Sequence, residues 1–240
     1  MDTSTDAGLR SFMLGVYNKL ALGILLAGVL AYAAGTWAPL TELIFNTPLY
    51  YVVQFGPIAL LLGSMFFMKN PSPLGSAILY WSIVTMIGLG LGIWVLMAGH
   101  STGSVTRAGT SLAPTYTTIA QAFLLTASAF GGLSLFGYTM KRNITGMGTF
   151  MFMAIWGVVG MSVISMFLPP SSMFEWIIMG AVFLLSAGII VWQTQALKVG
   201  YYQLGGDQRG MAVMTNWGAL NFFISFINMF RIVMMLLSRD

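Results

Sequence analysis

Two cations lie deep within hydrophobic runs of this 240-residue chain. Lys19 and Arg231 each stand about seven residues, or roughly 10 Å of helix, inside such a run. An ionisable group surrounded by hydrocarbon is costly and marks a functional site unless its side chain reaches the interface. Both side chains are long enough to reach it, and Arg231 could instead form an ion pair with Glu175.

The last hydrophobic run carries a polar stripe. Gly218, Asn221, Ser225 and Asn228 recur at steps of three and four residues, which places them within an arc of roughly 80° on a helix. Polar side chains of a spanning helix must face protein or water, so we expect the other helices to surround this one. The stripe either lines a pathway or bonds to neighbouring helices.

The residue types needed for catalysis or metal binding are scarce. The chain has no cysteine, and its six acidic residues occur at helix ends and in loops. His100, the only histidine, has no Asp, Glu or Cys at ligand spacing, so we assign it no role. Paired carboxylates, nucleophile motifs and phosphate-binding loops are also missing. We therefore expect no enzyme, and neither a metal nor a cofactor.

The composition is that of an integral membrane protein. Hydrophobic residues make up 58% of the chain and charged residues 7%, against about 25% charged residues in soluble domains. A soluble chain would need polar helix faces that these runs lack, and barrel strands would alternate apolar and polar residues. The formal net charge of +4 then reflects membrane topology, and we expect no nucleic-acid partner.

We predict an all-α membrane protein with one domain, residues 1–240, and seven transmembrane helices. The predicted spans are near residues 12–36, 49–68, 74–99, 117–138, 147–168, 173–195 and 214–237. Turn residues such as Trp37-Ala38-Pro39 separate them, so most connections should be tight hairpins. Longer connections are expected at 100–116 and 198–213. Gly88 and Gly92 offer a small-residue face for close helix packing.

The cations predict the orientation. Six occupy one set of alternating connections: Arg10, Lys69, Lys141, Arg142, Lys198 and Arg209. Arg107 and Arg239 fall on the other side. Connections rich in Lys and Arg stay in the cytoplasm, so the amino terminus should be cytoplasmic and the carboxy terminus outside. No signal-peptide cleavage pattern precedes the first span, which we expect to be retained.

Four segments together resemble the Bax inhibitor-1 family, the transmembrane Bax-inhibitor-motif proteins. They are residues 9–23 (LRSFMLGVYNKLALG), 136–143 (FGYTMKRN), 193–198 (QTQALK) and 218–230 (GALNFFISFINMF). The first is most similar to bacterial members. The second departs from the family pattern at Asn143, which stands in place of an acid.

The resemblance implies a fold whose last helix is central and wrapped by the other six. It also implies a calcium leak that responds to pH through one aspartate in each of the last two segments. Gln193 and Ser225 stand at those two positions here. Two close carboxylates share a proton and titrate as a pair, whereas an amide and a hydroxyl can only hydrogen-bond. We therefore expect a latch that has lost or altered its pH gating.

Two functions remain open from the sequence. The first is a leak or channel for calcium or another cation. The second is a non-conducting regulator that binds other membrane proteins, because bacterial relatives are associated with a membrane-anchored quality-control protease. The missing carboxylates weaken any calcium site and add weight to the second. In both cases we expect a multi-pass protein in the lipid bilayer of a bacterial inner membrane.

Overall fold

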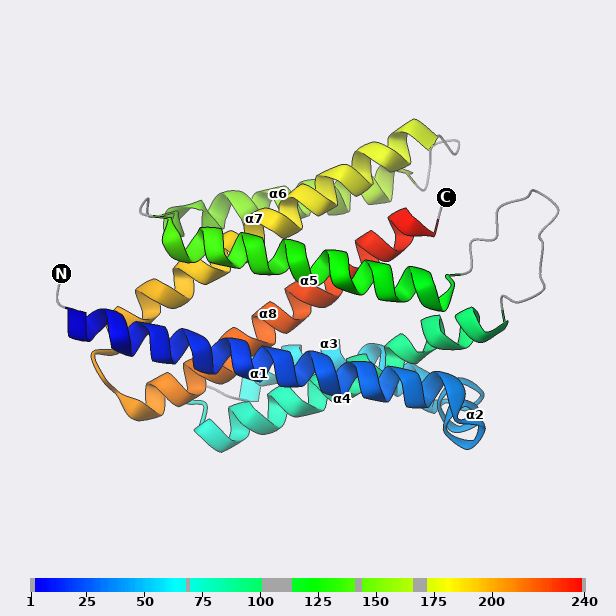
Figure 1. Ribbon diagram of the computed structural model, residues 1–240, viewed down its shortest axis with the longest axis horizontal. Helices are drawn as coiled ribbons and strands as arrows, with labels where there is room; N and C mark the ends of the chain where they lie inside the picture. Colours follow the sequence, from blue (N-terminus) through cyan, green and yellow to red (C-terminus); the bar gives the residue numbers. More distant parts are fainter. Residues whose placement is uncertain (1–2, 68–69, 101–113, 141–143, 166–171, 239–240) are drawn as a thin grey trace.

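The computed structural model describes residues 3–67, 70–100, 114–140, 144–165 and 172–238, and these segments are almost wholly helical (Figure 1). The helices are α1 (Thr3–Thr36), α2 (Ala38–Phe45), α3 (Leu49–Phe67), α4 (Pro73–His100), α5 (Tyr116–Thr139), the 3₁₀ turn η1 (Thr145–Met147), α6 (Gly148–Ser165), α7 (Ser172–Leu204) and α8 (Gln208–Leu237). The described residues form no strand.

Local sequence explains where the last helix begins. Gly205 and Gly206 adopt φ values of 55° and 94°, a left-handed conformation that residues with a Cβ rarely take. Asp207 then caps α8, its carboxylate accepting hydrogen bonds from the backbone N–H of Arg209 at 3.0 Å and of Gly210 at 3.1 Å. These residues allow α7 and α8 to reverse direction within a short turn.

Six helices are long and apolar enough to cross a membrane. They are Ala7–Thr36, Leu49–Phe66, Pro73–Gly99, Tyr116–Thr139, Trp176–Leu204 and Gln208–Leu237, and each matches a predicted span. The span predicted at 147–168 corresponds to α6, whose described apolar part, Gly148–Met161, is shorter. The multi-pass helical architecture is thus confirmed, but the count of seven spans is not.

Two predicted connections are wrong. Residues 38–45, expected to form a tight hairpin, fold into α2, where Pro39 occupies a first-turn position that needs no backbone N–H donor. Residues 198–213, expected to be a longer connection, are mostly helical because α7 continues to Leu204 and α8 starts at Gln208. Hydropathy marks where a helix leaves hydrocarbon, which need not be where the helix ends.

Helix α8 lies between two groups of helices. Figure 1 shows it running diagonally across the bundle and crossing both α1 and α5. It packs mainly against α1, α4, α5 and α7, whereas α3 packs on α4 and α6 on α7. In its most apolar stretch of 18 residues, 56% of the residues are buried, against 17–39% in the other five spans. The predicted wrapping by all six other helices is not confirmed.

Helices α1 and α4 approach each other closely at small residues. A Cβ on Gly88 would lie 2.7 Å from Ala27 Cα, and one on Gly92 would lie 2.7 Å from Ala34 Cβ. Both glycines are buried. The predicted small-residue packing face is therefore confirmed, and α1 is its partner.

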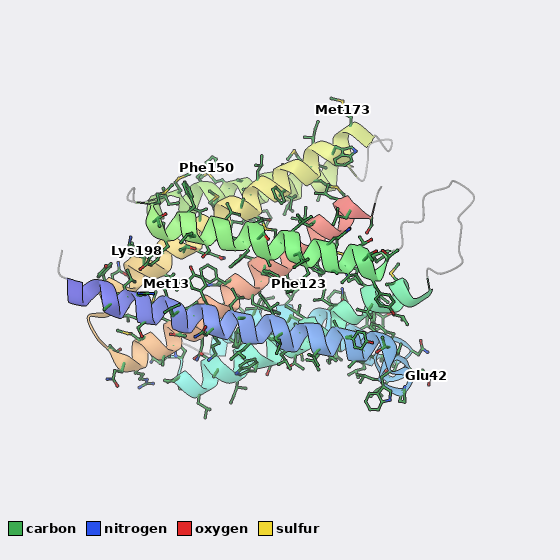
Figure 2. All side chains as sticks on the ribbon, in the orientation of Figure 1. Met13, Glu42, Phe123, Phe150, Met173 and Lys198 are labelled. Carbon is green, nitrogen blue, oxygen red and sulfur yellow. The ribbon has the colours of Figure 1, made fainter. Side chains whose placement is uncertain are left out.

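The two ends of the bundle differ in charge. The helix starts that carry Arg10 and Arg209 lie near the amino-terminal end of the long axis, with Lys198, and Glu42 lies at the opposite end (Figures 1 and 2). The other cations that predict the orientation, Lys69, Arg107, Lys141, Arg142 and Arg239, lie outside the described residues. Which end faces the cytoplasm stays a prediction.

Candidate functional site

Gln193 of α7 and Ser225 of α8 meet across the helix interface. Ser225 Oγ donates a hydrogen bond to Gln193 Oε1 over 3.0 Å. Ser225 is buried, with 7% of its surface exposed, and Gln193 is half-buried. The two positions that the resemblance assigns to a carboxylate pair are thus in direct contact and uncharged. Their role as a latch stays a prediction.

A cavity of about 220 Å³ lies beside this hydrogen bond. Its lining comes entirely from α7 and α8: Trp192, Gln193, Ala196, Leu197, Met214, Trp217, Gly218 and Asn221. Gly218 allows the two helices to approach here, because a Cβ on it would lie 2.7 Å from Leu197 Cδ2. Two side-chain amides, Gln193 and Asn221, supply the polar groups of an otherwise apolar wall.

The predicted polar stripe divides into two halves. Gly218 and Ser225 are buried, whereas Asn221 and Asn228 are exposed and have no hydrogen-bond partner within the described segments. At 100° per residue the two asparagines lie about 60° further around the helix than the buried pair. Within the described residues, other helices therefore cover only the half of the stripe that holds Gly218 and Ser225, and α8 keeps one uncovered side.

Arg231 lies near this uncovered side and is half-buried. Its Nε is buried without a hydrogen-bond partner in the part of the chain that the structure describes. The side chain of Glu175, its predicted partner, is outside that part, so the ion pair stays a prediction. The same holds for His100, whose side chain is not among those described.

Lys19 belongs to a polar junction that the sequence did not reveal. Its Nζ donates to Oδ1 of Asn216 on α8 and lies 5.6 Å from the ring centroid of Tyr80 on α4. Asn216 Nδ2 in turn donates to Ser76 Oγ at 2.8 Å and to the Pro73 carbonyl at 3.0 Å. The ammonium group therefore has a protein partner, and snorkelling is not needed to explain it.

The residues after Gln193 contact α5. Thr194 is buried and lies 3.4 Å from Ser134 Oγ, which is 2.5 Å from the hydroxyl of Tyr17 on α1. Gln195 Nε2 donates to the carbonyls of Gly137 at 2.9 Å and Met140 at 3.0 Å, which are orphan acceptors at the end of α5. Three consecutive side chains thus join α7 to two helices, Gln193 to α8 and both Thr194 and Gln195 to α5.

Sequence reasoning missed Asn216, Tyr80 and Ser76. Asn216 is not part of the polar stripe because it lies at a different angular position around α8. A signal was available in the last span, since Asn216 is an amide at about the same distance from the charged bundle end as Lys19. Only the rotation of α1 and α8 about their axes brings the two side chains together.

The chemistry available to these residues is hydrogen bonding. Among the described side chains the only carboxylates, Glu42 and Asp207, are exposed near the ends of the bundle. No group of three or more His, Asp and Glu that could hold a metal ion occurs in the described segments. The hydrogen bond between Gln193 and Ser225 therefore involves no group that titrates near neutral pH.

Comparison with known proteins places the chain in a family. The family model described as inhibitor of apoptosis-promoting Bax1 matches residues 9–240. An uncharacterised protein of Caulobacter vibrioides is 43% identical over 97% of this chain and 90% of its own length. The uncharacterised protein RP147 of Rickettsia prowazekii is 32% identical, over 95% and 89%. The inner membrane protein YbhL of Escherichia coli is 27% identical, over 93% and 89%. The resemblance seen in the four sequence segments is thus confirmed, and the chain is a multi-pass membrane protein of the Bax inhibitor-1 family.

Proposed function

We propose that the chain is a passive cation leak, calcium being the first ion to test, whose gate does not respond to pH. The observation that carries this proposal is the hydrogen bond between Ser225 and Gln193, which joins α7 to α8 beside a cavity. The leak acts in a bacterial inner membrane with the amino terminus in the cytoplasm, and α6 serves as a seventh span. No chemical reaction is part of the function.

The physical argument concerns the absence of charge at the latch. A carboxylate pair at these positions would raise one of its own pKa values and couple helix packing to pH. A hydroxyl donating to an amide oxygen has no such coupling. Amide oxygens are also weaker ligands for a divalent cation than carboxylates, so any ion that reaches this contact is bound weakly.

Calcium flux into liposomes tests the proposal. Purified protein is reconstituted around a calcium-sensitive dye, and initial rates are recorded at pH 6, 7 and 8 beside protein-free liposomes. We expect a flux above the protein-free rate that is the same at all three values. The proposal fails if no flux is seen at any pH, or if the rate follows a titration curve.

Restoring the carboxylates gives a sharper version of the test. The double variant Gln193→Asp, Ser225→Asp should acquire a pH-dependent rate, because two facing carboxylates titrate as a coupled pair. Each single substitution is a matched control for the coupling, since a lone carboxylate titrates in one step whose pKa is set by burial and not by a facing like charge. A double variant whose rate stays independent of pH would show that this contact does not control conduction.

The uncovered side of α8 favours a second candidate, a non-conducting regulator. Asn221 and Asn228 are exposed on a membrane-spanning helix without partners among the described residues, and polar groups facing lipid favour association with another helix. Under this proposal a membrane protein, such as a membrane-anchored quality-control protease, contributes that helix.

Co-purification separates this candidate from the leak. Leucine at both Asn221 and Asn228 should abolish recovery of the protease with the tagged chain and should change the turnover of its membrane substrates. Gln54→Leu is a matched control, because Gln54 is another exposed amide on a spanning helix but lies on α3. Equal recovery with all variants would remove the reason for this second function.

A further inference from the structure

A long apolar furrow separates α1 from α5. Both helices pack on α8, and the space between them holds two cavities, of about 570 and 460 Å³. Ile24 and Phe226 line both cavities, so the two are successive parts of one furrow with α8 as its floor. Figure 2 shows Met13 from one part and Phe123 from the other, both between α1 and α5.

The furrow runs through most of the bilayer. Its lining on α1 extends from Arg10 to Tyr32, which corresponds to about 33 Å of helix, close to the ~30 Å of hydrocarbon in a membrane. An extended hydrocarbon chain fits a furrow of this length and apolar lining.

Among the described residues that line the furrow, the charged side chain lies at one end. Arg10 lines the cavity at the end where α1 begins. Lys198 Nζ lies 5.7 Å from the ring centroid of Tyr138, which lines the same cavity. No carboxylate lines either cavity among the described residues. Two cations beside an apolar furrow match a molecule with an anionic head and a long hydrocarbon tail.

We propose that this furrow binds an anionic phospholipid. One acyl chain lies between α1 and α5 against Phe226, and the phosphate lies between Arg10 and Lys198. Within the furrow, Tyr17 and Ser134 hydrogen-bond to each other at 2.5 Å, so neither hydroxyl is an unpaired polar group beside the acyl chain. The lipid fills the space between two helices that are joined by α8 and by the hydrogen bond between Tyr17 and Ser134.

Two glycines allow the furrow to be filled without disturbing its walls. Gly131 lines one cavity and Gly28 the other, and a Cβ on either would meet no atom within 4 Å. The double variant Gly131→Leu, Gly28→Leu places side chains where the acyl chain would lie. Gly132→Leu, Gly15→Leu is the matched control, since these positions are equally open but line neither cavity.

Native mass spectrometry of delipidated protein with added phosphatidylglycerol or phosphatidylcholine measures binding. We expect one phosphatidylglycerol per chain, with affinity reduced about tenfold in the filled variant, as for the loss of two buried methylenes, and unchanged in the control. Thermal unfolding in detergent verifies that both variants remain folded. Equal lipid binding by the filled variant and wild type would refute the site.

The positive charge at the Arg10 end of the furrow is tested separately. Arg10→Gln should reduce the preference for phosphatidylglycerol over phosphatidylcholine about fivefold, the usual contribution of one cation near an anionic headgroup. Arg209→Gln is the control, because Arg209 is an exposed cation at the same end that lines neither cavity. Equal binding of the two lipids by the wild-type protein would overturn the anionic headgroup.

Discussion

Replacing Asn216 with alanine should destabilise the bundle more than any other single loss of a polar side chain on α8. The amide is buried, with 4% of its surface exposed, and it joins three helices. It accepts from the ammonium group of Lys19 on α1 and donates to Ser76 and Pro73 at the start of α4. Alanine removes all three hydrogen bonds and leaves Lys19 with only the face of Tyr80 nearby.

The magnitude follows from the kinds of bond lost. A hydrogen bond to a charged group contributes about 1.5–3 kcal/mol, and a neutral one between membrane helices contributes about 0.6 kcal/mol. One charged and two neutral bonds therefore give a loss of about 3–4 kcal/mol in the free energy of unfolding. Asn221→Ala, on the same helix but exposed and without partners in the described segments, should change it by less than about 0.5 kcal/mol.

Reversible unfolding in mixed detergent micelles, followed by tryptophan fluorescence, measures both variants. A double-mutant cycle with Lys19→Met isolates the ionic contact, and we expect a coupling energy of at least about 1.5 kcal/mol. The double variant should be more stable than Asn216→Ala alone, because no unpaired cation remains. A coupling energy near zero would refute the view that Asn216 is the partner that holds Lys19 in the membrane.

Three further predictions concern helix contacts. Gly88→Ala should destabilise the folded protein by about 1–3 kcal/mol, because the added Cβ would meet the α1 backbone at 2.7 Å. Gly15→Ala is the control, because its Cβ would lie in open space, and it should be neutral or stabilise by up to about 1 kcal/mol. Thermal unfolding distinguishes the two variants. Tyr17→Phe should cost about 0.6–1.7 kcal/mol in the same unfolding assay, since Ser134 then loses its partner on α1. Ser225→Ala should raise the liposome calcium flux by releasing Gln193, and an unchanged rate would argue that the contact is not a gate.

Several features could be predicted from the sequence because they depend on local properties. Hydropathy alone locates the six long spanning helices, since an apolar segment in lipid must satisfy its own backbone hydrogen bonds and a helix does so. The small residues Gly88 and Gly92 indicate a close helix contact before its partner is known. The motif around Gln193 and the one around Ser225 identify the family. None of these inferences requires knowledge of how the helices are arranged.

Other features depend on long-range packing and could not be predicted. The pairing of Lys19 with Asn216 requires that α1 and α8 be correctly rotated and offset along their axes. The exposure of Asn221 and Asn228 follows from α8 being packed by two separate groups of helices, which leaves one of its sides uncovered. The furrow between α1 and α5 arises because both helices rest on α8.

Composition makes this chain a helical membrane protein, and residue identity leaves positions 193 and 225 without charge. The contact of Ser225 with Gln193, the pairing of Lys19 with Asn216 and the open side of α8 follow from how the helices pack together. Membrane insertion is a sum over the residues of one helix, whereas each contact depends on the relative rotation of two helices that are distant in the chain.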